Sequence, residues 1–298
     1  MIKLFWICFF TSILGRLIKT VFRLPFVFIG SINDYLSYCE SIWHYDSPKL
    51  IKTLYYNFRL CDFRLAVKMP IYVYGKTKTW SLSGKVKIIS DKITSGMIKW
   101  GYDWGYRSNG ITIIRIEGEV IFHGSCILAK ASDIAVFNGA SMSIGMGAEI
   151  LENTIIYCSD SITIGDNFSF TFQSSMFDTD FHYILNINDR RIHRRSVPII
   201  IGNNVWVGNR ATIKKGVVIP DNTTIAASYT VLTKDYSDIP PFSILGGCPA
   251  KLLASGYSRI WKDEMSNISK FDNYFKEHDN NYYEVENNSI SDYIYGCQ

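Results

Sequence analysis

The stretch Pro198–Val231 reads PIIIGNNVWVGNRATIKKGVVIPDNTTIAASYTV and repeats an aliphatic residue every sixth position, at Ile201, Val207, Ile213, Ile219, Ile225 and Val231. A period of six fits neither an α-helix, with 3.6 residues per turn, nor a strand with two alternating faces. It is typical of a solenoid in which each unit forms a short strand and a corner around a shared interior. Glycine, asparagine and aspartate, which tolerate corner conformations, fill the intervening positions. An ordinary β-sandwich is the alternative interpretation.

The same rhythm can be followed upstream, which sets the extent of the solenoid. It starts near Ile114, weakens at Ser132 and Asn138, and is reset by a two-residue shift that leads through Ile164, Phe170, Met176 and His182. We therefore predict one β domain over 71–254, with 183–198 leaving it as an extruded loop. Within this domain, Gly96–Asn109 is rich in glycine and aromatic residues and is expected to be a loop or corner.

The regions before and after the repeats have a different composition. Residues 1–30 are apolar and aromatic, and Lys3, Arg16, Lys19 and Arg23 are their only charges. The apolar run is shorter than the roughly 20 residues of a membrane span, and a small-residue cleavage site is missing. Such a segment suits a helix at an anionic membrane surface, although packing against the protein itself is the alternative. Residues 31–70 are predicted as a helical region, and 255–298 as a helix followed by a tail.

Composition excludes several classes of protein. An apolar content of 47% excludes disorder for most of the 298 residues. The seven cysteines include no C-x-x-C pair, which indicates reduced thiols in a cytoplasmic protein, peripheral at the inner face of the membrane if its N-terminus binds there. The net charge of +4 equals that of residues 1–30, so the remainder is neutral. A nucleic-acid partner is therefore not expected.

One polar cluster, at the end of the section with the sixfold repeat, contains side chains suited to catalysis. The chain has no P-loop, G-x-S-x-G elbow or H-E-x-x-H motif, which leaves Asp178-Thr-Asp180-Phe-His182. A histidine with an ordinary pKa near 6.5 can act as a general base on a hydroxyl at neutral pH, with Asp178 and Asp180 orienting its imidazole. A lone histidine in a turn is more often structural. A metal site from His123, His182 and His193 is disfavoured because arginines surround His193, and we expect no metal.

The motifs from Ile199 to Leu253 resemble those of the hexapeptide-repeat acyltransferases, in particular their sugar O-acetyltransferase branch. The shared features are D-x-D-F-H before an arginine-bearing loop, P-I-x-I-G-x-N-V-W-V-G, I-P-D-N, T-K-D and I-P-P-F-S-I-L-G-G-C-P-A-K. The resemblance implies a left-handed parallel β-helix that assembles as a homotrimer. It also implies acetyl-CoA as the donor, bound between subunits, and His182 as the base that deprotonates the acceptor hydroxyl.

Donor-site residues also follow from the resemblance. Trp206 matches a tryptophan along the donor site, and an outward corner residue is the alternative interpretation of it. The other implied contacts with coenzyme A are Asn209, Ser228, Thr233, Lys234 and Lys251. Two departures concern this region: Asn209 replaces the usual serine, and one extra residue near Tyr229 shifts the register around Ser228.

An arginine cluster in the extruded loop is the candidate for binding an anionic acceptor or the phosphates of coenzyme A; a solvated loop is the alternative. It contains Arg190, Arg191 and Arg194. The sequence therefore predicts transfer of an acetyl group to a sugar hydroxyl of a cell-surface polysaccharide or a lipid-linked glycan precursor. N-acetylation of an amino sugar, acetylation of a serine-like small molecule, and a non-catalytic β-helix scaffold remain as alternatives.

Overall fold

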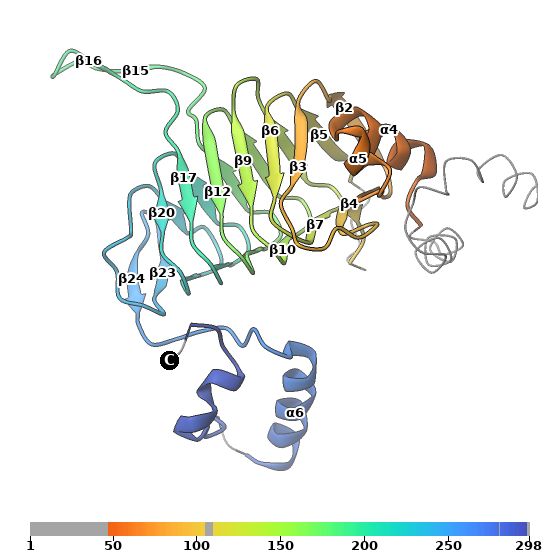
Figure 1. The fold of residues 1–298 in the computed structure, drawn as a ribbon. Coiled ribbons are helices and arrows are strands. Elements are labelled where there is room, and N and C mark those ends of the chain that lie inside the picture. The colour runs from red at the N-terminus through yellow and green to blue at the C-terminus, as the bar shows by residue number, and fades with distance from the viewer. Residues whose placement is uncertain (1–46, 105–109, 280, 297–298) are drawn as a thin grey trace, which may run out of the picture.

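The protein folds as a parallel β-helix with helices at both ends (Figure 1), as seen in a computed structural model that describes residues 47–104, 110–279 and 281–296. Consecutive strands of the β-helix belong in turn to three different sheets. Within each sheet, a strand pairs in parallel with the strand of the next coil. This confirms the predicted mainly β fold, a β-helix preceded and followed by helical segments. The predicted membrane-surface segment at 1–30 lies outside the described residues.

The three sheets have nine, seven and six strands in the described chain. The nine-strand sheet contains β1 (Ile71–Val73), β4 (Ile98–Tyr102), β7 (Cys126–Ala129), β10 (Ala148–Ile150), β13 (Ser169–Phe170), β18 (Trp206–Val207), β21 (Thr224–Ile225), β23 (Ile244–Gly246) and β24 (Lys251–Ala254). The seven-strand sheet contains β2 (Thr77–Ser81), β5 (Thr112–Ile116), β8 (Asp133–Val136), β11 (Ile155–Cys158), β14 (Ser175–Phe177), β19 (Thr212–Lys214) and β22 (Val231–Leu232). The six-strand sheet contains β3 (Lys85–Ile88), β6 (Glu119–Phe122), β9 (Ser141–Ile144), β12 (Ser161–Ile164), β17 (Ile199–Ile201) and β20 (Val218–Ile219).

Three corners join the sheets in every coil. The first corner leads from the nine-strand to the seven-strand sheet, the second to the six-strand sheet, and the third back to the nine-strand sheet. At most corners the third residue after an inward-facing residue has a positive φ, namely Ala131, Gly139, Gly147, Asn153, Asn167, Gln173, Asn204, Arg210, Gly216, Asn222 and Ser228. Glycine and asparagine adopt this left-handed conformation most readily, which explains their regular recurrence in the sequence.

The third corner is reinforced by a ladder of asparagine side chains. The Asn167 amide nitrogen donates to the Asn204 side-chain oxygen at 2.9 Å, and the Asn204 nitrogen donates to Asn222 at 3.0 Å. Each amide has both a donor and an acceptor, so one residue type can link every coil to the next. The ladder keeps the coils in register at the corner where β18 begins.

The coils shorten along the chain, which explains where the sixfold prediction fails. The chain advances 22 residues from Ile127 to its partner Glu149, and 18 from Trp206 to Thr224. Only the 18-residue coil contains three six-residue units. In the longer coils the prediction that Asn138 points inward is wrong, because this residue lies exposed at a corner.

Two further local predictions are wrong for identifiable reasons. Gly96–Asn109, expected to be a loop, contains β4, whose Trp100 side chain is almost fully buried in the interior. Val231 was expected to point inward, but Leu232 is the buried residue. Ser228 and Tyr229 both have a positive φ and accommodate the extra residue at this corner. The inward-facing position therefore moves by one residue, from Val231 to Leu232.

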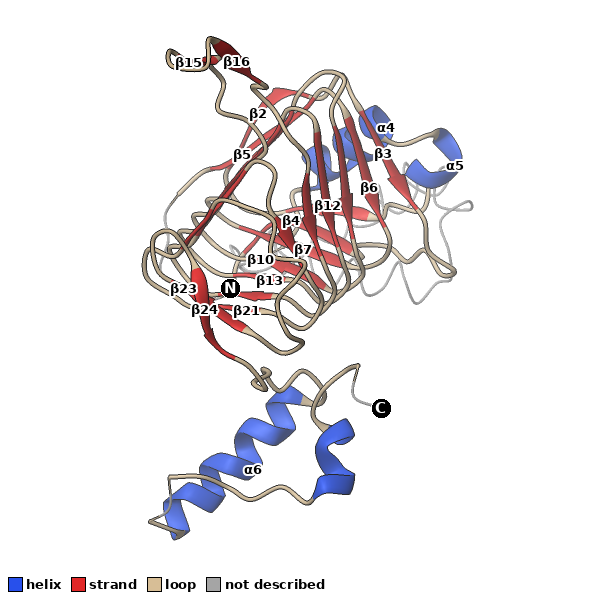
Figure 2. Ribbon diagram, turned by 90° about the vertical axis from the view of Figure 1, so that its left-hand side faces the viewer, coloured by secondary structure: helices blue, strands red, loops and turns tan. Residues whose placement is uncertain are grey.

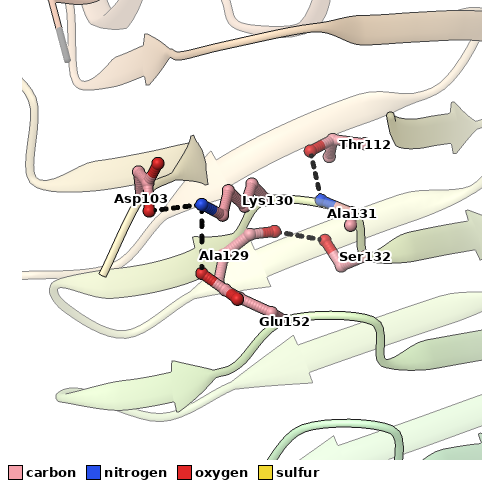
Figure 3. A network of polar contacts seen from close by, with 7 residues as sticks. All are labelled: Asp103, Thr112, Ala129, Lys130, Ala131, Ser132 and Glu152. Atoms are coloured by element: carbon pink, nitrogen blue, oxygen red, sulfur yellow. Dashed lines mark hydrogen bonds and ion pairs between the residues drawn. The ribbon is translucent and has the colours of Figure 1, made fainter. Parts of the chain in front are cut away.

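The first corner of the longer coils contains a buried charge cluster (Figure 3). The Lys130 ammonium contacts Asp103 Oδ1 at 2.6 Å and Glu152 Oε1 at 3.8 Å. Burial raises the pKa of the Glu152 carboxyl, and the Lys130 charge opposes that shift. Ser132 Oγ closes the corner by donating to the Ala129 carbonyl at 2.7 Å. This cluster joins neighbouring coils.

Helices close or follow the two ends of the solenoid. Helices α4 (Leu50–Leu60) and α5 (Phe63–Ala66) cover its N-terminal end (Figure 1). The Asn57 side chain donates to the Ile71 carbonyl at 2.7 Å and accepts from the Ile71 amide at 3.1 Å. At the other end, β24 folds back antiparallel onto β23. Helix α6 (Glu264–Glu277) and a 3₁₀ helix (Asn287–Asp292) lie apart from the body of the β-helix (Figure 2).

A two-stranded hairpin leaves the solenoid at the second corner. Its strands β15 (Ile184–Asn186) and β16 (Arg191–His193) pair antiparallel and project from the body (Figure 1). This is the segment predicted to be extruded at 183–198. No helix in the described part of the chain is long and apolar enough to cross a bilayer.

Candidate active site

The hairpin is attached to the β-helix by a paired neck. The Val197 amide donates to the Asp178 carbonyl at 2.9 Å, and the Asp180 amide donates to the Arg195 carbonyl at 3.0 Å. Between these bonds, Thr179 and Ser196 form an antiparallel bridge. The neck therefore fixes the position at which the chain leaves the body, immediately before His182.

Phe181 sets the direction in which the chain leaves the neck. Its φ is +58°, an unfavourable region for an aromatic residue, and its amide donates to Thr179 Oγ1 at 3.0 Å. Its ring packs edge-on against Phe137 and Tyr157, with centroids 6.1 and 6.0 Å away. Strained backbone of this kind persists where surrounding packing holds it and is frequent at functional sites. The conformation of Phe181 places the next residue, His182, in an exposed position at the second corner.

Asp178 binds the preceding coil rather than the imidazole. Its side chain is fully buried, and its two oxygens accept the Ser159 amide at 2.7 Å and the Asp160 amide at 2.8 Å. Burial raises the pKa of the Asp178 carboxyl, and these two backbone bonds oppose the shift. The expectation that Asp178 orients His182 is therefore not met within the single chain.

Asp180 is also engaged in holding the hairpin. Its carboxylate pairs with the Lys215 ammonium at 2.5 Å, and the same ammonium donates to the Arg194 carbonyl at 2.6 Å. Both Asp180 and Lys215 are largely screened from solvent. Lys215 thus joins the two legs of the neck to β19. Among the described residues, the His182 imidazole has no hydrogen-bond or ion-pair partner.

The predicted acceptor-binding arginines lie on the hairpin. Arg190, Arg191 and Arg194 are all exposed, and so are the apolar hairpin residues Ile187 and Ile192. Among the described residues, no other part of the chain covers these exposed cations and aliphatic side chains of the hairpin.

Trp206 lies on the outer surface of the nine-strand sheet. Its ring is 36% exposed, and the Arg259 guanidinium lies over it at 5.6 Å from the ring centroid. Arg259 also stacks on Trp261 at 4.6 Å and forms two hydrogen bonds with Glu264. Nothing in the repeat pattern pointed to Arg259, because it lies in the tail beyond the last coil. The C-terminal segment therefore packs over the predicted donor-site tryptophan.

The remaining predicted donor residues lie on the last coils. Asn209 and Ser228 are stacked at the first corner, where the Ser228 amide donates to the Asn209 carbonyl at 2.8 Å. Thr233 and Lys234 are exposed at the second corner of the last coil, and Lys251 is exposed on β24. The exposed Trp206 ring, the polar backbone at the first corner and the two exposed lysines on later strands and corners are groups that suit a ligand with an apolar arm and phosphate groups.

One chain does not bring all of these residues together. His182 lies at the second corner, as do Thr233 and Lys234 on a later coil, whereas Asn209 and Ser228 are at the first corner, a sheet width away from His182. In the described residues, no three histidine, cysteine or acidic side chains gather in a way that can hold a metal ion.

Sequence comparison relates the chain to known acetyltransferases. It is 34% identical over 117 residues to galactoside O-acetyltransferase of Escherichia coli K12, a match covering 39% of this chain and 54% of that protein. Over 59 residues it is 42% identical to a probable macrolide acetyltransferase of Lysinibacillus sphaericus, covering 20% and 31%. These matches agree with the resemblance of the repeats to the hexapeptide-repeat acetyltransferases. The chain spans about half the length of the first of these relatives and less of the second.

Other comparisons give weaker matches. No family model matches the chain. The solved structure of the polysialic-acid-specific acetyltransferase NeuO aligns with a TM-score of 0.43 and 19% identity, over 73% of this chain and 91% of that one. A galactoside acetyltransferase in complex with coenzyme A aligns with a TM-score of 0.33 and 31% identity, over 38% and 55%.

Replacing Asp178 separates a structural from a catalytic role. An asparagine amide offers one acceptor oxygen, so Asp178→Asn leaves one buried backbone amide without its partner. We expect the free energy of unfolding to fall by about 1–3 kcal/mol, measured by urea denaturation. Asp160→Asn, an exposed neighbour, is the matched control and should change little. Unchanged stability together with lost activity would instead make Asp178 an orienting carboxylate.

Proposed function

We propose that this protein is an acetyl-CoA-dependent O-acetyltransferase that modifies a sugar hydroxyl, with His182 as the general base. The observation that carries the proposal is the 34% identity to a galactoside O-acetyltransferase. The location of His182 supports it, because the paired neck and the conformation of Phe181 fix the backbone that presents this exposed residue at the second corner.

The proposed reaction is direct transfer between acetyl-CoA and the acceptor. The His182 imidazole takes the hydroxyl proton while the hydroxyl oxygen attacks the thioester carbonyl carbon. The tetrahedral oxyanion then collapses, the carbon–sulfur bond breaks, and the imidazolium returns its proton to the sulfur of coenzyme A. A backbone amide at the first corner is the expected donor to the oxyanion.

The site is proposed to form between subunits of a homotrimer. The width of a sheet separates His182 from Asn209 and Ser228 in one chain, which supports a site completed by the first corner of a second chain. A head-to-tail interface repeated around a threefold axis closes a ring and gives every site one half from each of two neighbours. The exposed apolar and basic hairpin is the part of the chain that is free to reach the next subunit.

The donor is proposed to lie along Trp206 and the first corner. Trp206 would contact the pantetheine arm, with Asn209 and Ser228 beside it, while Thr233, Lys234 and Lys251 would meet the distal part with its phosphates. Arg259 adds a further cation above the Trp206 ring.

The acceptor is proposed to be a cell-surface polysaccharide or a lipid-linked precursor of one. The exposed Arg190, Arg191 and Arg194 suit an anionic acceptor. A second candidate is a small antibiotic-like molecule, because matches to a macrolide acetyltransferase and to chloramphenicol acetyltransferases also occur. Each of those matches covers only about a fifth of this chain, so the sugar acceptor is preferred.

Replacing the proposed base should abolish transfer but leave donor binding. We expect His182→Ala to lower sugar-dependent release of coenzyme A thiol by about 10²–10⁴-fold, the usual effect of losing a general base. His193→Ala, in the same hairpin, is the matched control and should retain activity. The acceptor panel contains mono- and oligosaccharides, chloramphenicol and a macrolide. Full activity of His182→Ala would exclude this residue as the base, and absence of both donor binding and transfer would favour a scaffold.

Mixing two inactive variants tests whether the site is shared between subunits. His182→Ala and Trp206→Ala are each expected to be nearly inactive alone. After co-refolding in equal amounts, about one quarter of the interfaces in a closed ring should combine two intact halves. Activity should therefore return to about that fraction of wild type. A mixture that stays inactive while sedimenting as a trimer would show that each chain holds a complete site.

Association with a membrane is proposed through residues 1–30, which combine aromatic residues with four positive charges. Deleting these residues should move the protein from the membrane to the soluble fraction of lysed cells, while the acetyltransferase activity on a water-soluble acceptor persists. Deleting residues 281–298, from the other end of the chain, is the control. Unchanged partitioning after removal of residues 1–30 would contradict the proposal.

A further inference from the structure

A hollow of about 190 Å³ lies on the outer face of the seven-strand sheet. We call it the aromatic groove, and its lining includes Trp80, Arg115, Asp133, Ala135, Phe137 and Tyr157. No residue of this groove occupies one of the repeated inward positions or belongs to the predicted donor site.

The hollow exists because a small residue lies between large ones. Ala135 on β8 is in register with Arg115 on the strand before it and with Tyr157 on the strand after it. Adjacent strands are about 4.8 Å apart, so the two large side chains stand on either side of a methyl group. The missing side-chain volume at Ala135 forms the floor of the groove.

Aromatic rings extend the groove toward the neck. Tyr157 packs edge-on against Phe137 and Phe177, with centroids 6.1 and 5.5 Å away. Phe181 continues this cluster against Phe137 and Tyr157. At the far end, the Trp80 ring is 62% exposed. The negative face of an aromatic ring attracts slightly positive C–H groups, such as those on the flat faces of sugar rings.

Polar groups with fixed directions accompany the rings. The Tyr157 hydroxyl donates to Asp133 Oδ2 at 2.8 Å, so the carboxylate is held in place. Its other oxygen, Oδ1, has no hydrogen-bond partner among the described residues. The Arg115 guanidinium lies over the Phe137 ring at 4.7 Å and donates to Glu117 at 2.9 Å. Ligand sites are commonly lined by aromatic side chains with a few oriented polar groups, and a sugar offers both an apolar ring face and hydroxyl groups to such a site.

The groove leads toward the proposed base. Its lining runs from Trp80 on β2 to Tyr157 on β11, which is three strand spacings or about 14 Å, and the rings of Phe177 and Phe181 continue beyond Tyr157. Phe181, at the end of the cluster, is the residue directly before His182. A chain of several sugar rings laid along the groove would therefore bring one end to His182.

We propose that the aromatic groove binds an oligosaccharide acceptor and presents one of its hydroxyls to His182. This inference rests on the proposed transferase function for its substrate class. A glycan is preferred to a second copy of the chain as the occupant, because its hydroxyl groups can donate to Asp133 Oδ1 and accept from Arg115 while its ring faces lie on the aromatic side chains. The acceptor is thus a glycan of several residues rather than a single sugar.

Filling the groove tests this proposal through binding alone. Ala135→Leu adds side-chain volume at the floor, and Thr163→Leu adds the same side chain to the exposed face of the six-strand sheet as a matched control. The probe is an array of immobilised tetra- to hexasaccharides, both neutral and acidic, including chitin and hyaluronan fragments. We expect Ala135→Leu to weaken binding of the bound glycans by at least about 10-fold, and Thr163→Leu to leave it unchanged.

A second variant guards against misfolding of the first. Trp80 is exposed, so Trp80→Ala should fold normally and weaken oligosaccharide binding by about 3- to 10-fold, as expected for one aromatic contact. For acetyl transfer, both variants should lower kcat/KM for the oligosaccharide and leave that for the corresponding monosaccharide unchanged.

The outcomes separate this inference from the proposed function. Groove-dependent glycan binding without any acetyl transfer would support the groove and contradict the transferase. Acetyl transfer that is insensitive to both groove variants, or no groove-dependent binding anywhere on the array, would overturn the groove. A change in sedimentation for Ala135→Leu but not for Thr163→Leu would show that another subunit covers this face, which would also overturn it.

Discussion

The central strands of the β-helix depend on the coil before them and the coil after them for their backbone hydrogen bonds. Within the solenoid, the parallel ladder satisfies these groups only if each coil returns to the same position. The corners must therefore repeat their conformation, and the left-handed residues that follow the inward side chains provide that repetition. Where the chain must depart from this constraint, as at residues 178–197, it does so through a neck that is itself paired.

The sequence predicts the features that follow from this repetition. The inward side chains of Ile201, Val207 and Ile213 recur because strands and corners do, and the period alone identifies a solenoid. The extruded segment was predictable for the same reason, since it interrupts the period. Predictions were wrong where coil length varies. A strict count of six assigns Asn138 and Val231 to the interior, but neither is the inward-facing residue, because the coil there is not a multiple of six residues long.

The contacts of the site were less predictable, because they join residues from different coils. Asp178, Asp180 and His182 are close in sequence and suggested a single constellation. Instead, the first clamps the preceding coil and the second binds Lys215, a residue 35 positions away from it. The spacing of residues in one segment cannot show which neighbouring coil will engage a side chain. Arg259 was missed for a similar reason, since the tail carries no repeat that would place it beside Trp206.

The cap formed by α4 also has a consequence for the behaviour of the protein in solution. The first strand of a solenoid exposes a row of free amides and carbonyls, onto which another molecule can add its own strand. Here Asn57 occupies the amide and carbonyl of Ile71, Thr53 Oγ1 accepts from the Val73 amide, and the Lys49 amide donates to the Val73 carbonyl. The helix thus imitates a neighbouring coil with side chains. It ends the ladder of the nine-strand sheet, so that another strand cannot add to the edge of β1 without displacing these bonds.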